Sequence, residues 1–301
     1  GELGAAANAD YASGATCHAE MAMVQVDPND TVTAVNTPAT PVPVCARHMD
    51  VNAQGNAVLA WSERDTTQPD EPLVFTTYDR NGSALAGPVQ VAGDVDFGGP
   101  VALNDDGTLL AAWEDQAVVF GQRFNLNGDP VDSGARRLDQ NKQSGASLVQ
   151  KLPSVSDDAE GGFVAAWNQD DIIADDPAFQ RTVRAQRWAA DGTADDTLLL
   201  YNEEYDFSID YSVPRVATDS GGNLAAVWVS RNGNQPQAAR GTVITAAGEV
   251  IGERGTRFAD FSDIDVMRPT GDPKVALSDD LAVVAWQCSV PPAIRRYCAP
   301  K

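Results

Sequence analysis

The stretch Pro100-Val-Ala-Leu-Asn-Asp-Asp-Gly-Thr-Leu-Leu-Ala-Ala-Trp113 sets the plan for most of the chain. It consists of an apolar alternation, an Asp/Asn/Gly turn, a second apolar run and a terminal Trp. The plan recurs from Pro153 to Trp167, from Pro214 to Trp228 and from Pro273 to Trp286, and a weaker copy runs from Met49 to Trp61. Each copy predicts a β-hairpin, and a glycine at the turn supplies the positive φ that such a turn needs.

A second type of hairpin lies between successive copies, and in most cases it turns at an Asn-Gly or Asp-Gly pair. The segment 20–35 adds a further hairpin near the N-terminus. The terminal tryptophans recur about every 50 to 60 residues, and no helical periodicity competes with the strand pattern. Repeated four-stranded units at this spacing predict an all-β protein with a β-propeller fold.

The hairpin count predicts five four-stranded blades, closed into a ring by pairing of the N-terminal and C-terminal strands. Closure removes the unpaired strand edges that an open array would expose. The segment 293–298 could supply one more strand, so six blades are the alternative. Residues 1–16 are small and polar and are predicted to form an N-terminal arm, and residues 17–301 a single propeller domain.

Each copy ends in a Trp that follows a run rich in Ala and Val. A propeller blade is covered on both faces, so its middle strands should be nearly continuous apolar runs. Small Ala side chains let adjacent sheets approach closely, and the indole is predicted to fill the wedge between blades. An exposed ring of indoles that stacks on sugars is the alternative. The five predicted structural residues are Trp61, Trp113, Trp167, Trp228 and Trp286.

The charge balance is strongly acidic, with 21 Lys and Arg against 43 Asp and Glu and a net charge of −22. Such a field repels phosphate backbones and anionic lipids, so nucleic-acid binding and membrane-surface binding are disfavoured. No apolar run is long enough for a transmembrane helix. The start of the sequence has no Met and no basic segment and resembles a mature end after removal of a signal peptide, which predicts a secreted, extracellular or periplasmic protein.

Four cysteines near the two ends of the chain predict two disulfides in an oxidising compartment. The sequence leaves the three connectivities open. The two histidines lie near two of these cysteines, so a tetrahedral transition-metal site built on His18 and His48 is the alternative. The cysteines are Cys17, Cys45, Cys288 and Cys298.

Several turns are rich in aspartate, the residue type that supplies hard oxygen ligands to calcium. None follows the full alternating calcium-loop pattern, so ordinary turn capping by the carboxylates is the favoured interpretation. No cofactor is predicted, and calcium is the alternative. The candidate ligands are Asp105, Asp106, Asp157 and Asp158.

Motifs for nucleophilic catalysis and for phosphate binding are absent from the sequence. There is no Gly-x-Ser-x-Gly pattern and no Gly-x-x-x-x-Gly-Lys loop. Paired carboxylates remain an option for glycoside chemistry, but so many acids make chance pairs inevitable.

The outer hairpins carry a Gln-Arg motif, which stands in the stretches Phe120-Gly-Gln-Arg-Phe-Asn-Leu-Asn-Gly128 and Arg184-Ala-Gln-Arg-Trp-Ala-Ala-Asp-Gly192. Together with the Pro…Gly…Trp hairpins, it resembles repeats of large bacterial secreted and surface proteins with β-propeller folds. The resemblance covers most of residues 43–288. It implies an extracellular interaction or structural module and assigns no active site.

These features favour a non-catalytic binding or assembly module at the cell surface over an enzyme. Its expected partner is a protein or a glycan, in a homo-oligomer or a larger assembly. The first alternative is a glycan-active enzyme that uses inward-facing carboxylates from different blades in the axial channel. The second alternative is a repeat lectin with equivalent pockets between blades.

Overall fold

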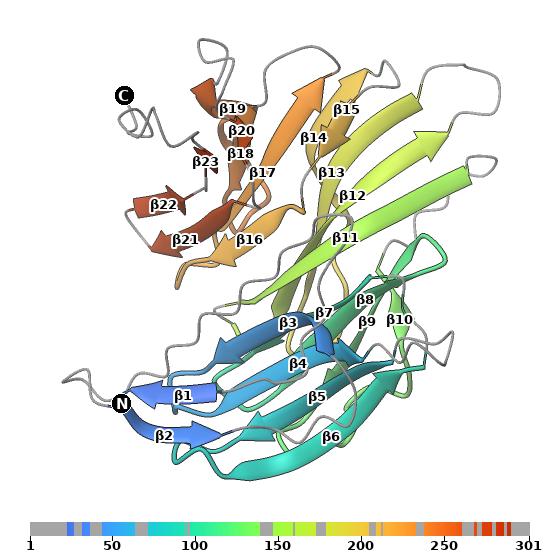
Figure 1. Cartoon of the computed structure of the whole chain (residues 1–301). Coiled ribbons are helices and arrows are strands. Elements are labelled where there is room, and N and C mark those ends of the chain that lie inside the picture. The colour runs from blue at the N-terminus through green and yellow to red at the C-terminus, as the bar shows by residue number, and fades with distance from the viewer. Residues whose placement is uncertain are drawn as a thin grey trace. The chain divides into compact units, whose positions relative to one another are not determined.

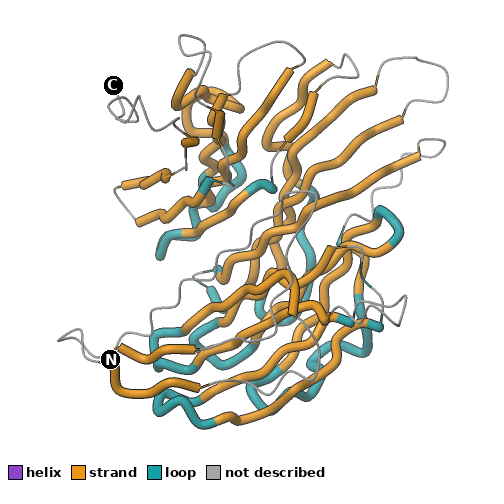
Figure 2. The backbone as a smooth tube through the Cα atoms, in the orientation of Figure 1, coloured by secondary structure: helices purple, strands orange, loops and turns teal. Residues whose placement is uncertain are grey.

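A computed structural model of the chain shows an all-β protein, with 23 strands and no helix among the described residues (Figures 1 and 2). The all-β class predicted from the repeats is therefore confirmed. The described residues are 23–26, 32–36, 44–63, 72–93, 95, 97–138, 147–158, 160–172, 179–204, 209–211, 213–232, 238–260, 268–269, 273–278, 281–285 and 288–289.

The chain divides into two compact units, each with its own sheets. Unit 1 comprises Gly1–Leu138 together with two short pieces, Val155–Asp157 and Gly161–Phe163. Unit 2 holds the remaining residues. The single propeller domain over residues 17–301 stays a prediction, and the predicted arm over residues 1–16 lies outside the described residues.

Unit 1 contains two four-stranded antiparallel sheets, in the orders β3-β4-β5-β6 and β10-β9-β8-β7, and the separate hairpin β1-β2 (Figure 1). In each sheet the first strand is an edge strand, and β3 lies beside β7 of the next sheet. The strands are β1 Met23–Val26, β2 Val32–Asn36, β3 Val44–Val51, β4 Ala57–Glu63, β5 Leu73–Tyr78, β6 Ala84–Ala92, β7 Phe97–Leu103, β8 Leu109–Asp115, β9 Val118–Phe124 and β10 Arg136–Arg137.

Unit 2 contains most of the four-stranded sheet β11-β12-β13-β14 and a five-stranded sheet around β17 and β18. In the second sheet both β15 and β16 pair with β17. Two-stranded sheets complete the unit. The strands are β11 Ser147–Asp157, β12 Phe163–Ile172, β13 Phe179–Trp188, β14 Leu198–Glu204, β15 Ile209–Tyr211, β16 Arg215–Thr218, β17 Leu224–Asn232, β18 Ala238–Ile244, β19 Val250–Asp260, β20 Arg268–Pro269, β21 Lys274–Ser278, β22 Leu281–Ala285 and β23 Cys288–Ser289.

The predicted hairpins all appear as paired strands. The Pro…Gly…Trp copies form β3-β4, β7-β8, β11-β12, β16-β17 and β21-β22, and the Gly-turn copies form the outer strands of the four larger sheets. At the β7-β8 turn the amide of Gly107 donates to the carbonyl of Asn104 at 3.0 Å. Gly107 has φ +86, and an added Cβ would lie 3.0 Å from the Leu126 side chain. The φ value therefore favours glycine at this turn, and the Leu126 side chain leaves little room for a Cβ.

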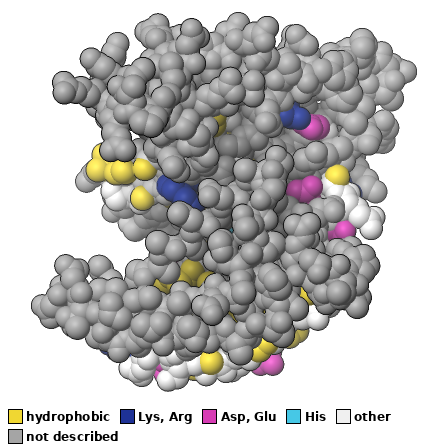
Figure 3. Space-filling model, viewed as in Figure 1, with side chains coloured by type: hydrophobic (Ala, Val, Ile, Leu, Met, Phe, Trp, Pro, Cys, Tyr) yellow, Lys and Arg dark blue, Asp and Glu magenta, His cyan; other side chains and the backbone are white. Residues whose placement is uncertain are grey.

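The last hairpin of unit 2, β21-β22, exposes apolar side chains. Leu281 is 61% exposed and Val283 is 53% exposed, and hydrophobic atoms gather on this hairpin at the left edge of Figure 3. In the described part of the chain, β21-β22 and β1-β2 are each hydrogen-bonded only within themselves. Pairing between these two hairpins, which ring closure requires, stays a prediction.

Four of the five repeat tryptophans are buried in the cores, and Trp286 lies outside the described residues. Trp113 packs in the apolar cluster shared by the first two sheets of unit 1, and Trp228 packs with β12 residues such as Val164 and Ala166. The Trp113 and Trp228 indoles therefore sit between neighbouring sheets, whereas Trp61 packs against residues of its own sheet. The Trp167 indole N–H donates to the Gln169 side chain at 3.4 Å, whereas the buried Trp228 indole N–H has no acceptor among the described residues.

Candidate functional site

The first three sheets carry equivalent turns after their edge strands β3, β7 and β11. In unit 1 these turns are joined by asparagine side chains. Asn52 Nδ2 donates to the Asn104 carbonyl at 3.0 Å, although the two residues are 52 positions apart in the chain. The second copy has an asparagine at the same turn position, Asn104, so the same kind of contact can join its turn to the third.

Asn104 makes the second connection. Its Nδ2 donates to the carbonyls of Gly161 at 2.8 Å and of Gly162 at 3.0 Å, both in the turn that follows β11. The side chain is almost fully buried, with the residue 2% exposed. A buried amide that satisfies two carbonyls holds this turn firmly against the end of β7, because leaving the carbonyls unpaired would be costly.

Asp50 stands at the centre of these connections, near the end of β3. Its Oδ2 accepts a hydrogen bond from the Leu103 amide of β7 at 2.7 Å, and its Oδ1 accepts one from the Val51 amide at 2.9 Å. Asp50 pairs in register with Val58 of β4, which belongs to the apolar cluster between the first two sheets. The carboxyl group is therefore held by backbone amides at the rim of an apolar core.

Burial raises the pKa of Asp50 from 3.8 to about 6, because desolvation of the charged form outweighs the hydrogen bonds from the amides of Leu103 and Val51. The negative charge of Asp157, at the end of β11, raises the pKa further. Asp157 itself is exposed to solvent. Unit 1 therefore brings together two carboxyl groups from different sheets, one in an apolar and one in an aqueous environment.

Both acids depart from the repeat. Asp50 stands two residues before the start of its turn. At the same position, the next three copies have small side chains, Ala102, Ser156 and Ala217. One residue before the turn, the copies have Val51, Leu103 and Thr218 where the third copy has Asp157. A scaffold does not need these two carboxyl groups, because the other copies fold without them.

This arrangement suits general acid chemistry. An acid with a pKa near 6 holds its proton for a substantial fraction of the time in mildly acidic solution and still transfers it readily. Each oxygen of Asp50 uses one lone pair for a backbone amide, so a second lone pair remains to carry the proton. A carboxyl group whose environment shifts its pKa strongly is typical of an acid or base role in an active site.

Three of the four candidate calcium ligands make other contacts, the fourth, Asp157, is the acid whose charge acts on Asp50, and calcium binding stays a prediction. Asp105 Oδ1 accepts from the Ala53 amide at 2.8 Å, and Asp106 accepts from the Thr108 amide at 2.7 Å. Asp158 forms an ion pair with Arg187 at 3.5 Å. No group of three or more His, Cys, Asp or Glu residues is arranged to hold a metal ion within the described ranges.

The cysteine and histidine predictions fall largely outside what the structure describes. Cys17, His18 and Cys298 lie in undescribed segments, and the side chains of Cys45 and Cys288 are likewise not described. His48 lies on β3, two residues before Asp50, and is partly buried. The disulfide connectivity and the transition-metal alternative stay predictions.

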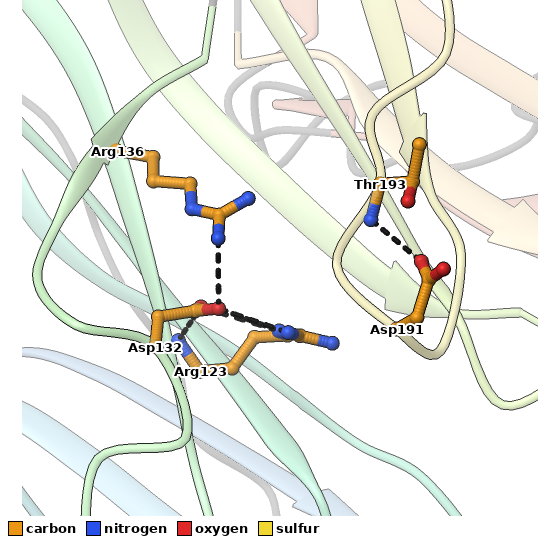
Figure 4. Close-up of polar contacts among 5 residues, drawn as sticks. All are labelled: Arg123, Asp132, Arg136, Asp191 and Thr193. Carbon is orange, nitrogen blue, oxygen red and sulfur yellow. Dashed lines mark hydrogen bonds and ion pairs between the residues drawn. The ribbon is translucent and has the colours of Figure 1, made fainter.

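The Gln-Arg motif of the outer hairpins has a structural role. Arg123 Nη2 binds Asp132 Oδ1 at 2.9 Å, and the more exposed Arg136 reaches the same oxygen at 3.4 Å (Figure 4). Burial alone would raise the pKa of Asp132, but the side chain and amide of Arg123 hold it below its usual range. In unit 2 the equivalent Arg187 donates to the Gly222 carbonyl at 2.6 Å.

The same figure shows how an aspartate caps an outer turn. Asp191 Oδ1 accepts from the Thr193 amide at 2.7 Å at the turn after β13 (Figure 4). This contact is the Asx-type capping that the sequence favours for its aspartate-rich turns. The motif residues therefore serve the scaffold, in contrast to Asp50 and Asp157.

Comparisons with known structures support the propeller fold. The chain is similar to the Penicillium chrysogenum α-L-arabinanase complexed with arabinobiose, with 11% identity, a TM-score of 0.52, and coverage of 88% of this chain and 80% of that chain. It is also similar to a Dyadobacter fermentans protein of unknown function, with 11% identity, a TM-score of 0.56, and coverage of 93% and 83%. No family model and no curated protein sequence matches the chain.

Together with the sheets, these likenesses confirm the predicted all-β propeller, and the sheets agree with five blades. The prediction of a non-catalytic binding or assembly module is wrong. The finding against it is that the Penicillium chrysogenum protein with the same fold is an α-L-arabinanase complexed with arabinobiose. The regular repeats define a scaffold, and a scaffold says nothing about the few positions where the copies differ.

Within the described ranges, no helix is long and apolar enough to cross a membrane.

Proposed function

We propose that this protein is a secreted or periplasmic glycan-active enzyme that cleaves glycosidic bonds, with Asp50 as the proton donor. The observation that carries the proposal is the Asp50 carboxyl group, which burial raises to a pKa of about 6, which two backbone amides hold, and on which the charge of Asp157 from another sheet acts. Two carboxyl groups from different blades at one end of the inner strands are what the glycan-active alternative requires.

The reaction needs a proton at the leaving oxygen. As the C–O bond breaks, its electron pair goes to that oxygen, and Asp50 supplies the proton that neutralises it. The sugar ring carries positive charge in the transition state, and the ionised Asp157 stabilises that charge. Water then adds to the anomeric carbon and gives a proton to the Asp50 carboxylate, so Asp50 regains the proton it donated and the two products together contain the elements of the water molecule.

The net charge of the protein limits the class of glycan that it can bind. A net charge of −22 repels polyanions, so a neutral oligosaccharide or polysaccharide is favoured over a uronic-acid or sulfated glycan. The partner of this protein is accordingly its glycan substrate. Extracellular or periplasmic location agrees with this role, because polysaccharides are met outside the cytoplasm.

The test is hydrolysis of a panel of neutral and anionic polysaccharides by the wild-type protein and by Asp50→Asn, Asp157→Asn and Asp105→Asn. The first two changes remove the proposed catalytic carboxyl groups and keep the side-chain size. Asp105→Asn is the matched control, because it changes a neighbouring acid whose contact is the Ala53 amide.

We expect new reducing ends from a neutral glycan with the wild-type protein and with Asp105→Asn. Asp50→Asn should lower kcat by about 10²- to 10⁴-fold, the usual contribution of general acid catalysis. Equal activity in Asp50→Asn and the wild type would contradict the assignment of Asp50. Lack of hydrolysis across the whole panel by folded wild-type protein would contradict the proposed function.

A further inference from the structure

Asn104 is buried beside the proposed site but does not itself have acid or base chemistry. It lies in the turn after β7, and its neighbour Leu103 holds Asp50 through a 2.7 Å hydrogen bond. Its side chain binds Gly161 and Gly162, in the turn that follows Asp157. One residue thus connects the backbone that holds one carboxyl group to the turn beside the other.

We infer that Asn104 is a positioning residue, which fixes Asp157 relative to Asp50 by clamping the β11-β12 turn to the end of β7. The inference rests on the proposed function of the two acids. Its geometric part concerns only the placement of two carboxyl groups and can be tested without any substrate.

The contacts of Asn104 explain why an asparagine is used. A carboxylate at this position would face the Gly161 and Gly162 carbonyls with oxygen against oxygen, and an apolar residue would leave both carbonyls without their present donor. The Asn104 carbonyl also accepts from Asn52, so the three successive turns of unit 1 form one hydrogen-bonded series. Asn104 is the middle member and touches both neighbours.

The consequence for catalysis follows from geometry. Displacement of a catalytic group by about 1 Å can cost about 100-fold in rate, even when the changed residue lies away from the reacting atoms. If Asn104 is replaced by Ala, the third turn loses both bonds to β7. The charge of Asp157 then acts less strongly on Asp50, and water reaches the Asp50 carboxyl group more easily.

Thr77→Val provides a matched control. The Thr77 hydroxyl is buried and donates to the Leu126 carbonyl at 2.6 Å, so it also joins the first sheet of unit 1 to a turn of the second. Thr77 lies on β5, two strands away from β3. The two changes therefore remove the same kind of contact at different distances from the acids.

The experiment measures the titration of the Asp50 carboxyl carbon by NMR, and kcat and KM on the glycan identified above, in the wild-type, Asn104→Ala and Thr77→Val proteins. We expect Asn104→Ala to lower the Asp50 titration midpoint and to lower kcat by about 10- to 100-fold with little change in KM. Thr77→Val should leave the midpoint and kcat near those of the wild type, even if it lowers stability.

An unchanged Asp50 midpoint in folded Asn104→Ala would overturn the inference, whether or not the protein cleaves glycans. A lowered midpoint with no glycan cleavage by the wild type would uphold the positioning role and contradict the proposed function. If Asn104→Ala does not fold, the exchange of the Asn104 side-chain amide protons is measured in the wild type instead. Slow exchange with solvent supports the positioning role, and free exchange contradicts it.

Discussion

The carboxylate of Asp50 on β3 accepts a 2.7 Å hydrogen bond from the Leu103 amide on β7, so an acidic side chain joins the edge strands of two neighbouring sheets. A neutral side chain in the same place would avoid the cost of burying a charge. The other copies of the repeat have such side chains there, Ala or Ser. The protein therefore keeps at Asp50 a group that is costly for the scaffold, as expected for a functional residue.

The cost of the Asp50 charge should be visible in the pH dependence of stability. The folded-state pKa is raised from 3.8 to about 6, so the folded protein holds a proton that the unfolded chain has lost in this interval. The free energy of unfolding should therefore fall as pH rises from about 4 to about 6.5, by at most about 3 kcal/mol from this group, since one pKa unit corresponds to about 1.4 kcal/mol.

Chemical denaturation of the wild type and of Asp50→Asn across this pH range measures the effect. The difference in unfolding free energy between the two proteins should change with pH in favour of Asp50→Asn. Parallel curves would show that Asp50 has an ordinary pKa. Asp132 does not interfere, because its lowered pKa places its titration below this range.

Removing a wedge indole should be among the most destabilising single changes in unit 2. Trp228 is 0% exposed and packs against β12, so Trp228→Ala leaves a large cavity and should cost about 3–5 kcal/mol. Val283→Ala, at an exposed position of β22, should cost less than about 0.5 kcal/mol. Urea unfolding gives both values, and similar losses for the two variants would contradict the placement of Trp228 in the core.

The two arginines that bind Asp132 should contribute very differently to stability. Arg123 is buried with its partner, so Arg123→Ala leaves a buried carboxylate short of its main ion partner and should cost about 3–5 kcal/mol. The Arg136 side chain is 47% exposed, and Arg136→Ala should cost less than about 1 kcal/mol. Thermal unfolding of the two variants compares them directly, and a larger loss for Arg136→Ala would refute this account of the motif.

Much of the fold could be predicted from the sequence, because several independent features of the repeat indicate the same structure. Alternating apolar residues, turn glycines such as Gly107 and a terminal Trp all indicate the same hairpin in each copy. The added strand β15 could not be predicted, because Tyr201–Tyr211 departs from the repeat.

The candidate site was harder to predict, because its signal is a difference between copies rather than a motif. Asp50 is one acid among 43, and only alignment of the copies shows that Ala or Ser stands at the equivalent positions. Its pairing with Leu103 joins residues 53 positions apart, which no local pattern reveals. Of the aspartates that the sequence did single out, as calcium candidates, Asp105 and Asp106 accept from turn amides, and only Asp157 belongs to the candidate site.

The central claim is that Asp50 donates the proton, and the pH–rate profile of glycan cleavage tests it most directly. The account predicts that kcat/KM of the wild-type protein falls tenfold per pH unit above an apparent pKa of about 6, the value expected for Asp50. The residual activity of Asp50→Asn should lack this descending limb, and Asp105→Asn should keep it. A descending limb that persists unchanged in Asp50→Asn would assign the proton to another group and contradict the account.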